Sequence, residues 1–335
     1  MKKILISFTL ALLALSAILV GCSTAPDLAK LEEVTLTEQM RVDELYNAAG
    51  DTIFFGAINL MECFGKELYI LCREPKQVMR LDCDLRFKNI VAREGRARYE
   101  YTQASTLCFD KGHLLIGDYA KSGFMKFTPE GQHIENYDIG GINTMAEYHQ
   151  AAKDGTIYTN HIDTESGTRF ARIDLTSANK TQAVAITKHN NELRTMIRNL
   201  AHTFIYGDEI ITLENDHIVA RYNKEWQLIE SYDLRIIPAI DQLIKNDEAD
   251  NGNSMSADVI VFDACVGGDY MSIIYQTLSW EGERSKVLAV NLKGKISPEK
   301  YLLLEGGKHY RLCANDSYIF AQPNRGGEIV RYRLP

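Results

Sequence analysis

The sequence predicts an all-β fold in which six four-stranded antiparallel sheets form a closed ring. Three observations support this prediction. Six similar segments follow one another, and each consists of a β-rich run, a polar turn and a second β-rich run. A short apolar strand precedes each segment, and a further strand follows most of them. Four-stranded repeats at a spacing of about 40–60 residues are typical of the blades of a β-propeller. The predicted fold is therefore a six-bladed β-propeller.

The six segments share a position at which a basic residue recurs. They begin at Glu67, His113, Thr156, Glu209, Tyr270 and Ser317. The basic residues in the second β-rich run are Arg80, Lys126, Arg172, Arg221 and Arg331, while Val290 takes that place in the fifth copy. Recurrence at one structural position indicates architecture rather than a binding stripe. We expect the stems to cover neighbouring sheet while the charges reach water or a carboxylate.

The strand patterns favour sheets that are covered on both faces. Successive residues of a strand point to opposite faces, and in three of the expected strands both sets are largely apolar: ELYILC from Glu67, HLLIGDY from His113 and YMSIIYQT from Tyr270. A strand shows this pattern when neighbouring sheets cover both of its sides, whereas a half-exposed sheet would alternate cleanly. The main rival is a pair of β-sandwich domains, which six tandem units make less suitable.

The ring requires a strand from outside the last copy. That copy ends at Leu334–Pro335, which leaves no room for its fourth strand, and an unpaired edge would be an aggregation hazard. We therefore expect an N-terminal strand to close the ring. The two candidates are Glu32–Thr37 and Thr52–Ile58. In the alternative, residues 32–58 contribute a partial seventh blade.

The first residues have the layout of an export signal. Lys2 and Lys3 form a positive region, Ile4–Leu19 is apolar, and small residues follow up to Cys22. Leu19–Cys22 resembles the bacterial lipobox, which implies that lipid is attached to Cys22 and that the chain is cleaved just before it. An uncleaved transmembrane anchor is the alternative, because about 18 apolar residues can span a bilayer.

This resemblance divides the chain into three parts. We expect a lipoprotein signal peptide at residues 1–21, a lipidated N-terminus and linker at residues 22–31, and the propeller at residues 32–335. Two or three acyl chains would hold the protein permanently at a membrane, since each buried CH₂ contributes about 0.8 kcal/mol. The membrane is thus an expected partner through Cys22.

Composition and charge exclude some classes of partner. Hydrophobic residues make up 45% of the chain and charged residues 24%, which indicates a globular protein rather than a disordered one. Without Lys2 and Lys3 the formal net charge of −8 becomes −10. Nucleic-acid binding depends on phosphate neutralisation by Lys and Arg, so we expect no nucleic-acid partner. We expect a monomer.

The cysteines are expected to be packing residues. Six remain besides Cys22, and no CxxC pair occurs among them. Four of these six lie in the first strands of their copies, which line the axis of a propeller: Cys63, Cys108, Cys265 and Cys313. Small, weakly polar cysteines suit such a crowded place, and we predict buried free thiols with no metal and no cofactor. An oxidising compartment permits at least one disulfide as the alternative.

Together these features resemble the TolB-like six-bladed β-propeller lipoproteins found mostly in Bacteroidetes. The resemblance covers residues 60–335 and the lipobox. REGRARYEY, from Arg93 to Tyr101, is similar to a Gly-x-Gly-Pro-Gly-Glu-aromatic stretch of that family, although Ala97 and Arg98 stand where the family has Pro-Gly. The resemblance implies the fold and the cell envelope, but it does not imply an activity.

A ligand site is expected on one face of the ring. In propellers the turns between second and third strands emerge on the same face as the connections between blades. The candidate ligand-binding residues on this funnel face are Arg73, Asp118, His161, Asp163, Asp216, His217, Trp280 and Arg325. Their mixed polarity suits a polar ligand.

Each of these candidates has two interpretations. His161 with Asp163, and Asp216 with His217, are residue types that bind divalent metals or transfer protons, but Asp also suits turns for backbone reasons. Trp280 suits stacking on a sugar, or it caps a long hairpin. Since no HExxH, GxSxG or phosphate-loop motif occurs, the catalytic residues are unknown.

Two inserts link blades on the same face, at about residues 188–200 and 235–258. Pro238 is expected to open a helix that runs through Lys245, since proline fits a first helical turn. The following NDEADNGNSMS reads as a mobile polar loop, and Asn190–Leu200 reads as a second helical insert. The inserts cover a ligand pocket or decorate its rim.

The sequence thus predicts a membrane-anchored binding protein for a protein, peptide or glycan ligand. The alternative is a metal-assisted hydrolase or lyase that acts on an envelope or glycan substrate. The absence of Asp after Cys22 favours the outer membrane, and the lack of an acidic run in residues 23–29 favours the side that faces the periplasm.

Overall fold

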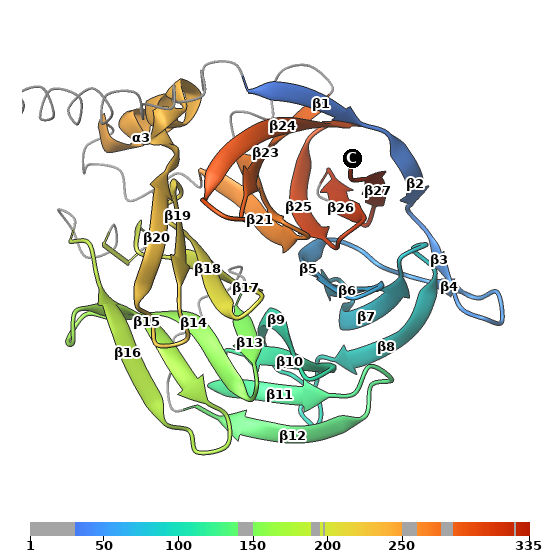
Figure 1. The fold of residues 1–335 in the computed structure, drawn as a ribbon. Helices are drawn as coiled ribbons and strands as arrows, with labels where there is room; N and C mark the ends of the chain where they lie inside the picture. Colours follow the sequence, from blue (N-terminus) through green and yellow to red (C-terminus); the bar gives the residue numbers. More distant parts are fainter. Residues whose placement is uncertain are drawn as a thin grey trace, which may run out of the picture. The chain divides into compact units, whose positions relative to one another are not determined.

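The computed structural model describes residues 31–139, 150–188, 195–196, 198–249, 260–275, 284–324 and 326–335. The segment Glu32–Pro335 forms one compact unit. Six sheets of four or five strands follow one another along this unit, and Figure 1 shows them arranged in a ring. The predicted six-bladed β-propeller is confirmed. No helix among the described residues has both the length and the apolar character needed to cross a membrane.

The first three blades are four-stranded meanders in which consecutive strands pair in chain order. Blade 1 contains β5 (Ile58–Phe64), β6 (Glu67–Arg73), β7 (Lys76–Asp82) and β8 (Phe87–Arg93). Blade 2 contains β9 (Ala104–Asp110), β10 (His113–Asp118), β11 (Gly123–Phe127) and β12 (His133–Asp138). Blade 3 contains β13 (Ala151–Lys153), β14 (Thr156–Asp163), β15 (Thr168–Asp174) and β16 (Lys180–Ala185).

The last three blades repeat this pattern, and two of them include N-terminal strands. Blade 4 contains β17 (Ala201–Tyr206), β18 (Glu209–Glu214), β19 (Ile218–Tyr222) and β20 (Leu228–Asp233). Blade 5 contains β21 (Val261–Gly267), β22 (Tyr270–Tyr275), β23 (Arg284–Asn291) and β24 (Ser297–Glu305), with β1 (Glu32–Leu36) at its edge. Blade 6 contains β25 (His309–Ala314), β26 (Tyr318–Pro323) and β27 (Ile329–Arg333), with β2 (Glu38–Val42) at its edge.

The first strands of the blades form the inner ring, and the core lies between the blades. Each first strand contacts the first strand of the next blade, and β25 contacts β5. Neighbouring residues of one strand face different blades. Val78 of β7 belongs to the cluster shared with blade 2, whereas Met79 belongs to the cluster shared with blade 6. Both side chains are fully buried, which explains why these strands are apolar on both faces.

The N-terminal segment closes the ring, but not through either expected strand. The fourth strand of blade 6 is β2, which pairs antiparallel with β27 from Glu38↔Tyr332 to Val42↔Ile329. Met40 and Val42 pack on the core, while Gln39 and Arg41 are exposed. An outer strand is covered on one face only, so its charged residues are compatible with pairing. The apolar content that suggested the two other segments was therefore misleading.

The two segments that were expected to close the ring have other places. Glu32–Leu36 forms β1, which pairs in parallel with β24 from Glu32↔Lys300 to Leu36↔Leu304. Thr52–Ile53 forms β4, which pairs with β3 (Leu45–Tyr46) in a small hairpin. The predicted alternative of a partial seventh blade is wrong, because the strands of residues 32–58 belong to blade 5, blade 6, this hairpin and, at Ile58, blade 1.

The inserts are helical where they are described. A 3₁₀ turn, η2 (Leu234–Ile236), leads into α3 (Pro238–Ala249). The helix begins at proline as predicted, and Ile240 and Ile244 are buried. It ends four residues later than expected, while residues 250–256 of the predicted loop lie outside the described residues. In the earlier insert, residues 195–196 and 198 are helical.

The recurring basic residues tie neighbouring blades together. Arg80 forms ion pairs with Glu67 of its own blade and, at 3.3 Å, with Glu130 of blade 2. Arg331 of blade 6 donates to the backbone oxygen of Cys83 at 2.5 Å and pairs with Asp84 of blade 1 at 2.7 Å.

Arg221 reaches the next blade through backbone oxygens. It belongs to blade 4 and donates to the backbone oxygens of Leu292 and, at 2.9 Å, Gly294 in blade 5. The expectation that these charges serve the architecture is therefore supported by the contacts of all three of these arginines, and carbonyl groups serve as partners as well as carboxylates.

Candidate functional site

The turns between second and third strands bring most of the predicted site residues to one face. Arg73 ends β6, Asp118 ends β10, Asp163 ends β14, and Asp216 and His217 form the turn between β18 and β19. Because the strands of each blade alternate in direction, these turns lie at the same end of the blades as the connections from one blade to the next. Trp280 and Arg325 lie outside the described residues.

Asp118 holds the connection between blades 1 and 2. Its side chain is fully buried, and its carboxylate accepts hydrogen bonds from the backbone amides of Thr102 at 2.7 Å, Gln103 at 3.0 Å and Ala120 at 3.1 Å. Three amide donors occupy most of the acceptor capacity of a carboxylate. Asp118 therefore lies beneath the funnel face, where it holds the backbone of the connection in place.

His161 and Asp163 also have partners within blade 3. Asp163 accepts from the amide of Ser166 at 3.1 Å and from Gln182 Nε2 at 2.7 Å, and these bonds lower the pKa of its carboxyl to about 2. His161 is buried, and its Nε2 lies 2.5 Å from Nζ of Lys180. Burial and the charge of Lys180 lower the pKa of His161, which favours the neutral imidazole.

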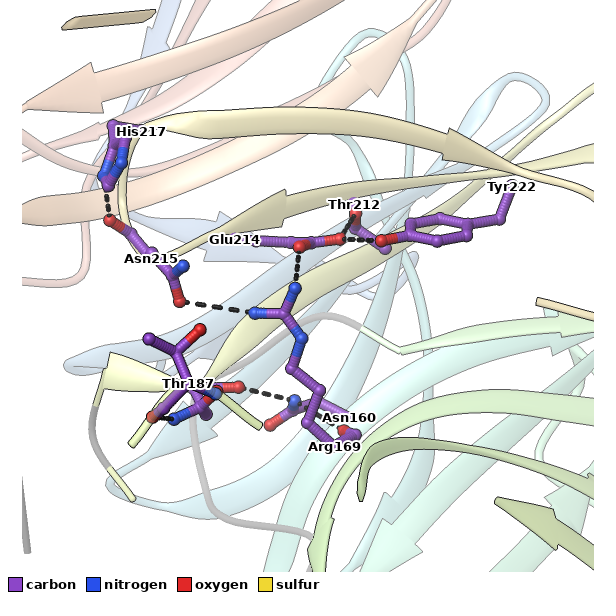
Figure 2. Close-up of polar contacts among 9 residues, drawn as sticks. Asn160, Arg169, Thr187, Thr212, Glu214, Asn215, His217 and Tyr222 are labelled. Carbon is purple, nitrogen blue, oxygen red and sulfur yellow. Dashed lines mark hydrogen bonds and ion pairs between the residues drawn. The ribbon is translucent and has the colours of Figure 1, made fainter. Parts of the chain in front are cut away.

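A buried polar network joins blades 3 and 4 (Figure 2). Arg169 of β15 forms an ion pair with Glu214 of β18. The same carboxylate accepts from the hydroxyls of Thr212 at 2.6 Å and Tyr222 at 2.7 Å. Arg169 Nη1 also lies 3.4 Å from Oδ1 of Asn215. Removal of one partner from a buried charge pair strongly destabilises a protein, because the other charge is left buried without compensation. The Arg169–Glu214 pair therefore fixes blades 3 and 4 to each other.

The amides below this network anchor the first insert. Asn160 of β14 donates to the backbone oxygen of Asn199 at 2.8 Å. Asn199 in turn donates to the backbone oxygens of Thr187 and Thr195, both at 2.7 Å, and its Oδ1 accepts from the amide of Thr187 at 2.8 Å. The described part of the insert is thereby held on blade 3.

Arg198 connects both inserts to the turn of blade 4. Its Nη1 donates to Asp216 Oδ2 at 2.5 Å, and its Nη2 forms an ion pair with Asp247 of α3. Close packing around Asp216 raises the pKa of its carboxyl to about 6, and this effect outweighs the opposing charge of Arg198. His217 Nδ1 lies 2.5 Å from the backbone oxygen of Asn215, and burial lowers the pKa of His217.

The residues that were predicted to bind a metal or transfer protons each contact a different side chain. His161 contacts Lys180, Asp163 contacts Gln182, and Asp216 contacts Arg198. In the described ranges no group of three or more His, Cys, Asp or Glu side chains is arranged to hold a metal ion. The six cysteines of the propeller are present as free thiols in the structure; four are buried, as expected, whereas Cys63 and Cys83 are partly exposed.

A pocket of about 460 Å³ lies on the funnel face between blades 1 and 2. It contains one predicted residue, Arg73, whose Nε donates to Asn59 Oδ1 at 3.0 Å. Lys76 and Glu94 form an ion pair of 2.6 Å at its side. Small-molecule sites usually have volumes of about 300–1,000 Å³, so this pocket is large enough for a ligand.

Two tyrosines complete this pocket, which we call the blade 1–2 pocket. Tyr119 follows β10 and leaves 47% of its surface exposed, whereas Tyr101 is buried. The hydroxyl of Tyr101 has no hydrogen-bond partner in the part of the chain that the structure describes. The backbone of Tyr101 is fixed, because its amide donates to Arg93 at 3.2 Å and its carbonyl oxygen accepts from Gly95 at 2.9 Å.

Sequence reasoning missed most of this pocket. Tyr119 is adjacent to Asp118, and Glu94 and Tyr101 belong to the REGRARYEY stretch that carried the family resemblance. That stretch connects blades 1 and 2 and crosses the funnel face. An aromatic residue in a connection between blades was the available signal, because such connections share a face with the turns between second and third strands.

Comparisons with known proteins find likeness in structure only. No protein-family model matches the chain, and no curated protein matches it in sequence. A Bacteroides fragilis protein that is named as an exported protein superposes with a TM-score of 0.54 at 11% identity, over 91% of this chain and 99% of that one. An inactive virginiamycin B lyase from Staphylococcus aureus superposes with a TM-score of 0.50 at 10% identity, over 88% of this chain and 100% of that one.

An auxiliary nutrient binding protein from Bacteroides thetaiotaomicron is similar at a TM-score of 0.49 and 12% identity, over 84% of this chain and 70% of that one. Identities this low are evidence of a common fold and of nothing finer. The β-propeller part of the predicted family resemblance is thus confirmed.

Proposed function

We propose that this protein binds a protein, peptide or glycan ligand on the funnel face without transforming it, and that the blade 1–2 pocket is the contact site. The observation that carries the proposal is the pocket itself, which combines about 460 Å³ of space with charged, amide and hydroxyl groups and an exposed tyrosine. A small number of polar groups that converge on a concave surface is typical of a ligand site.

The surroundings of the pocket support a preformed site. Asp118 fixes the backbone of Thr102 and Gln103, which line the pocket. Arg73 is aligned by Asn59, and its backbone amide donates to Ala57 at 2.7 Å. A site whose walls are already ordered loses less conformational entropy on binding.

The test is a thermal-shift screen of the purified protein against peptides, polysaccharide fragments and envelope extracts. A ligand that binds only the folded state raises the unfolding temperature, and the shift grows with the logarithm of its concentration once the site is saturated. We expect such a shift, unaccompanied by chemical change of the ligand, and we expect Arg73→Ala to reduce it. Arg284→Ala, which changes an exposed arginine of blade 5, is the control. A shift that Arg73→Ala leaves intact contradicts the proposed contact site.

The alternative of a metal-assisted hydrolase or lyase is distinguished by the same samples. No described contact favours it, since His161, Asp163 and Asp216 have separate partners. A stoichiometric divalent ion that is lost in His161→Ala and Asp216→Ala, together with turnover of a ligand, would replace binding with catalysis as the function.

We further propose that the protein belongs to the TolB-like lipoproteins and is held in the cell envelope by lipid on Cys22, as a monomer at the periplasmic side of the outer membrane. The Leu19–Cys22 pattern supports this location, and Cys22 lies outside the described residues. In the native host, Cys22→Ser is expected to abolish labelling by palmitate and to move the protein into the soluble fraction. Cys83→Ser, at another cysteine of the propeller, is the control and should leave both unchanged. Retention of Cys22→Ser in membranes would favour an uncleaved anchor.

A further inference from the structure

We propose that the ligand of the blade 1–2 pocket is a neutral carbohydrate, a conclusion that rests on the proposed binding function of that pocket. Three features of the pocket lead to this class of ligand: balanced charge, an exposed aromatic ring at the rim, and recognition groups that belong to side chains rather than to backbone.

The charged groups of the pocket are balanced. Two are basic, Arg73 and Lys76, and two are acidic, Glu74 and Glu94. Lys76 and Glu94 pair at 2.6 Å, so much of their charge is satisfied within the pocket wall. A site for an anion or a cation usually concentrates one sign of charge, which raises the local concentration of the oppositely charged ligand. This pocket has no such excess, whereas it has donors and acceptors suited to hydroxyl groups.

The two tyrosines of the pocket offer a sugar an apolar ring surface and a hydroxyl group. Tyr119 is 47% exposed at the rim, so its ring is available to the apolar C–H face of a pyranose. Tyr101 lies deeper and is only 2% exposed. An unpaired buried hydroxyl is costly. Tyr101 Oη has almost no accessible surface, so a small shift of the side chain is needed before a sugar hydroxyl can bond to it and remove that cost.

The backbone amides near the pocket are already used within the protein. Those of Arg73, Thr102 and Tyr119 donate to Ala57, Asp118 and Gln103, respectively, at distances of 2.7–2.9 Å. An extended peptide is commonly recognised through a row of unpaired backbone groups. Because these groups are occupied, the side chains of the pocket make the contacts, and they suit separate hydroxyl groups better than a peptide backbone.

The experiment is titration calorimetry of the purified protein with neutral tetrasaccharides of glucose, mannose and xylose. Acidic tri-galacturonate, basic chitosan tetramer and a hexapeptide mixture are titrated in parallel. We expect a neutral tetrasaccharide to bind, Tyr119→Ala to weaken that binding roughly tenfold, and Tyr101→Phe to weaken it while leaving the unfolding temperature within a few degrees. Tyr46→Ala is the matched control, because Tyr46 is 52% exposed but lies on the β3–β4 hairpin.

The possible results separate this inference from the function on which it rests. Binding of a charged glycan or a peptide alone, weakened by Tyr119→Ala, would overturn the neutral carbohydrate and leave the binding function in place. Binding of a neutral sugar that neither Tyr119→Ala nor Tyr101→Phe alters would overturn the pocket as its site. If none of these probes binds and envelope extracts also produce no thermal shift, both proposals fail.

A separate observation concerns the seam between the first and last blades. Cys63 of β5 and Cys313 of β25 lie on neighbouring inner strands, and their Sγ atoms are 3.1 Å apart. Cys63 is partly exposed, whereas Cys313 is buried. We infer that these two thiols are oxidised to a disulfide in the envelope, so that a covalent bond joins blade 1 to blade 6.

The oxidation is a two-electron exchange. The thiolate of the accessible Cys63 attacks the disulfide of an envelope thiol oxidoreductase, and Cys313 then attacks the mixed disulfide. The two cysteines lose two protons and two electrons, and the oxidoreductase is released as a dithiol. Only the oxidant depends on the proposed location; the pairing depends on the distance between the two sulfur atoms.

Peptide mapping after treatment with oxidised glutathione tests the pairing without reference to export. After free thiols have been alkylated, we expect one cross-linked peptide pair that contains Cys63 and Cys313, and we expect Cys108 to remain alkylated. Cys63→Ser should abolish the cross-link, and the oxidised wild-type protein should unfold at a higher temperature than the reduced one. Alkylation of both cysteines, or a cross-link from Cys63 to Cys265, would overturn the inference.

Discussion

Individual arginines show how a repeated residue in the sequence acquires its role. The repeat identified Arg80, Arg221 and Arg331 as equivalent, and the contacts confirm that they serve the architecture. The sequence could not identify their partners, because each arginine reaches into a different blade at a turn whose position depends on the closure of the ring. For Arg331, those partners lie 248 and 247 residues earlier in the sequence, at Cys83 and Asp84.

Arg331→Ala is expected to destabilise the protein by about 2 kcal/mol. The guanidinium bonds Asp84 and the backbone of Cys83 and lies over the ring of Tyr318 at 4.6 Å, and hydrogen bonds to charged groups contribute about 1.5–3 kcal/mol. Urea unfolding measures the change. Arg333→Ala, at the exposed end of the same strand, should stay within about 0.5 kcal/mol of the wild type. Equal effects of the two substitutions would contradict the role of Arg331 as a tie between blades.

Buried histidines predict a loss of stability in acid. His309 is fully buried between Ser285 Oγ at 3.1 Å and Tyr332 Oη at 3.0 Å, and burial lowers its pKa to about 4. Below pH 6.5 the unfolded chain binds a proton at this histidine that the native state does not, so stability falls as the pH decreases from 6.5 towards 4. The lowered pKa values of His161 and His217 act in the same direction.

Asp216 opposes this effect, because its raised pKa makes the native state take up a proton between about pH 6 and 4. With three histidines against one carboxyl, we expect the urea midpoint to fall from pH 7 to pH 5. His309 alone should lower the free energy of unfolding by about 2 kcal/mol between pH 7 and pH 5. His309→Gln should therefore show a smaller decrease in the urea midpoint over this range. An unchanged pH dependence in His309→Gln would show that this histidine is not held neutral.

At the scale of elements, the sequence predicted the strands better than their pairing. The need for an N-terminal closing strand followed from the short last copy, and this expectation is confirmed. The identity of the strand did not follow, because β2 carries the charged residues Glu38 and Arg41, which bond to each other at 2.6 Å. Arg41 also contacts Glu328. Outer strands of blades have one wet face, so apolar content alone does not reveal them.

Helix α3 shows the same limit. Asn246–Ala249 read as loop because their polarity is high, yet Asp247 pairs with Arg198 from another insert and Lys245 pairs with Asp241 at 2.6 Å. A tertiary ion pair and a local one thus extend the helix beyond the point at which propensity would end it.

Truncation separates the roles of the two N-terminal strands. A chain that begins at Asp43 lacks β1 and β2 and leaves the edge of β27 unpaired, so we expect aggregation or a large decrease in unfolding temperature. A chain that begins at Glu38 lacks only β1, whose neighbour β24 already completes a four-stranded meander, and it should remain folded with a smaller decrease. Size-exclusion chromatography and thermal unfolding followed by circular dichroism distinguish the two. Equal stability of both chains would contradict closure by β2.

For the whole molecule, internal repetition was sufficient to predict the fold but not the site. The repeat fixes the number of blades, and burial of both sheet faces follows from it. The blade 1–2 pocket arises where the copies differ, through Tyr101 in a connection and Tyr119 after a turn. Residues that were singled out for their chemistry, such as Asp118 and His161, have partners inside their own region. Only three-dimensional neighbours distinguish a carboxylate that supports a turn from one that meets a ligand.

The parallel pairing of β1 with β24 has a mechanical consequence for a protein tethered at its N-terminus. Tension applied ahead of Glu32 acts along the axis of β1, and the row of backbone bonds from Glu32 to Leu36 resists it in shear, all at once. The load therefore passes into blade 5 before it reaches β2. If lipid on Cys22 holds the chain as proposed, the strand that closes the propeller is thereby shielded from tension on that tether.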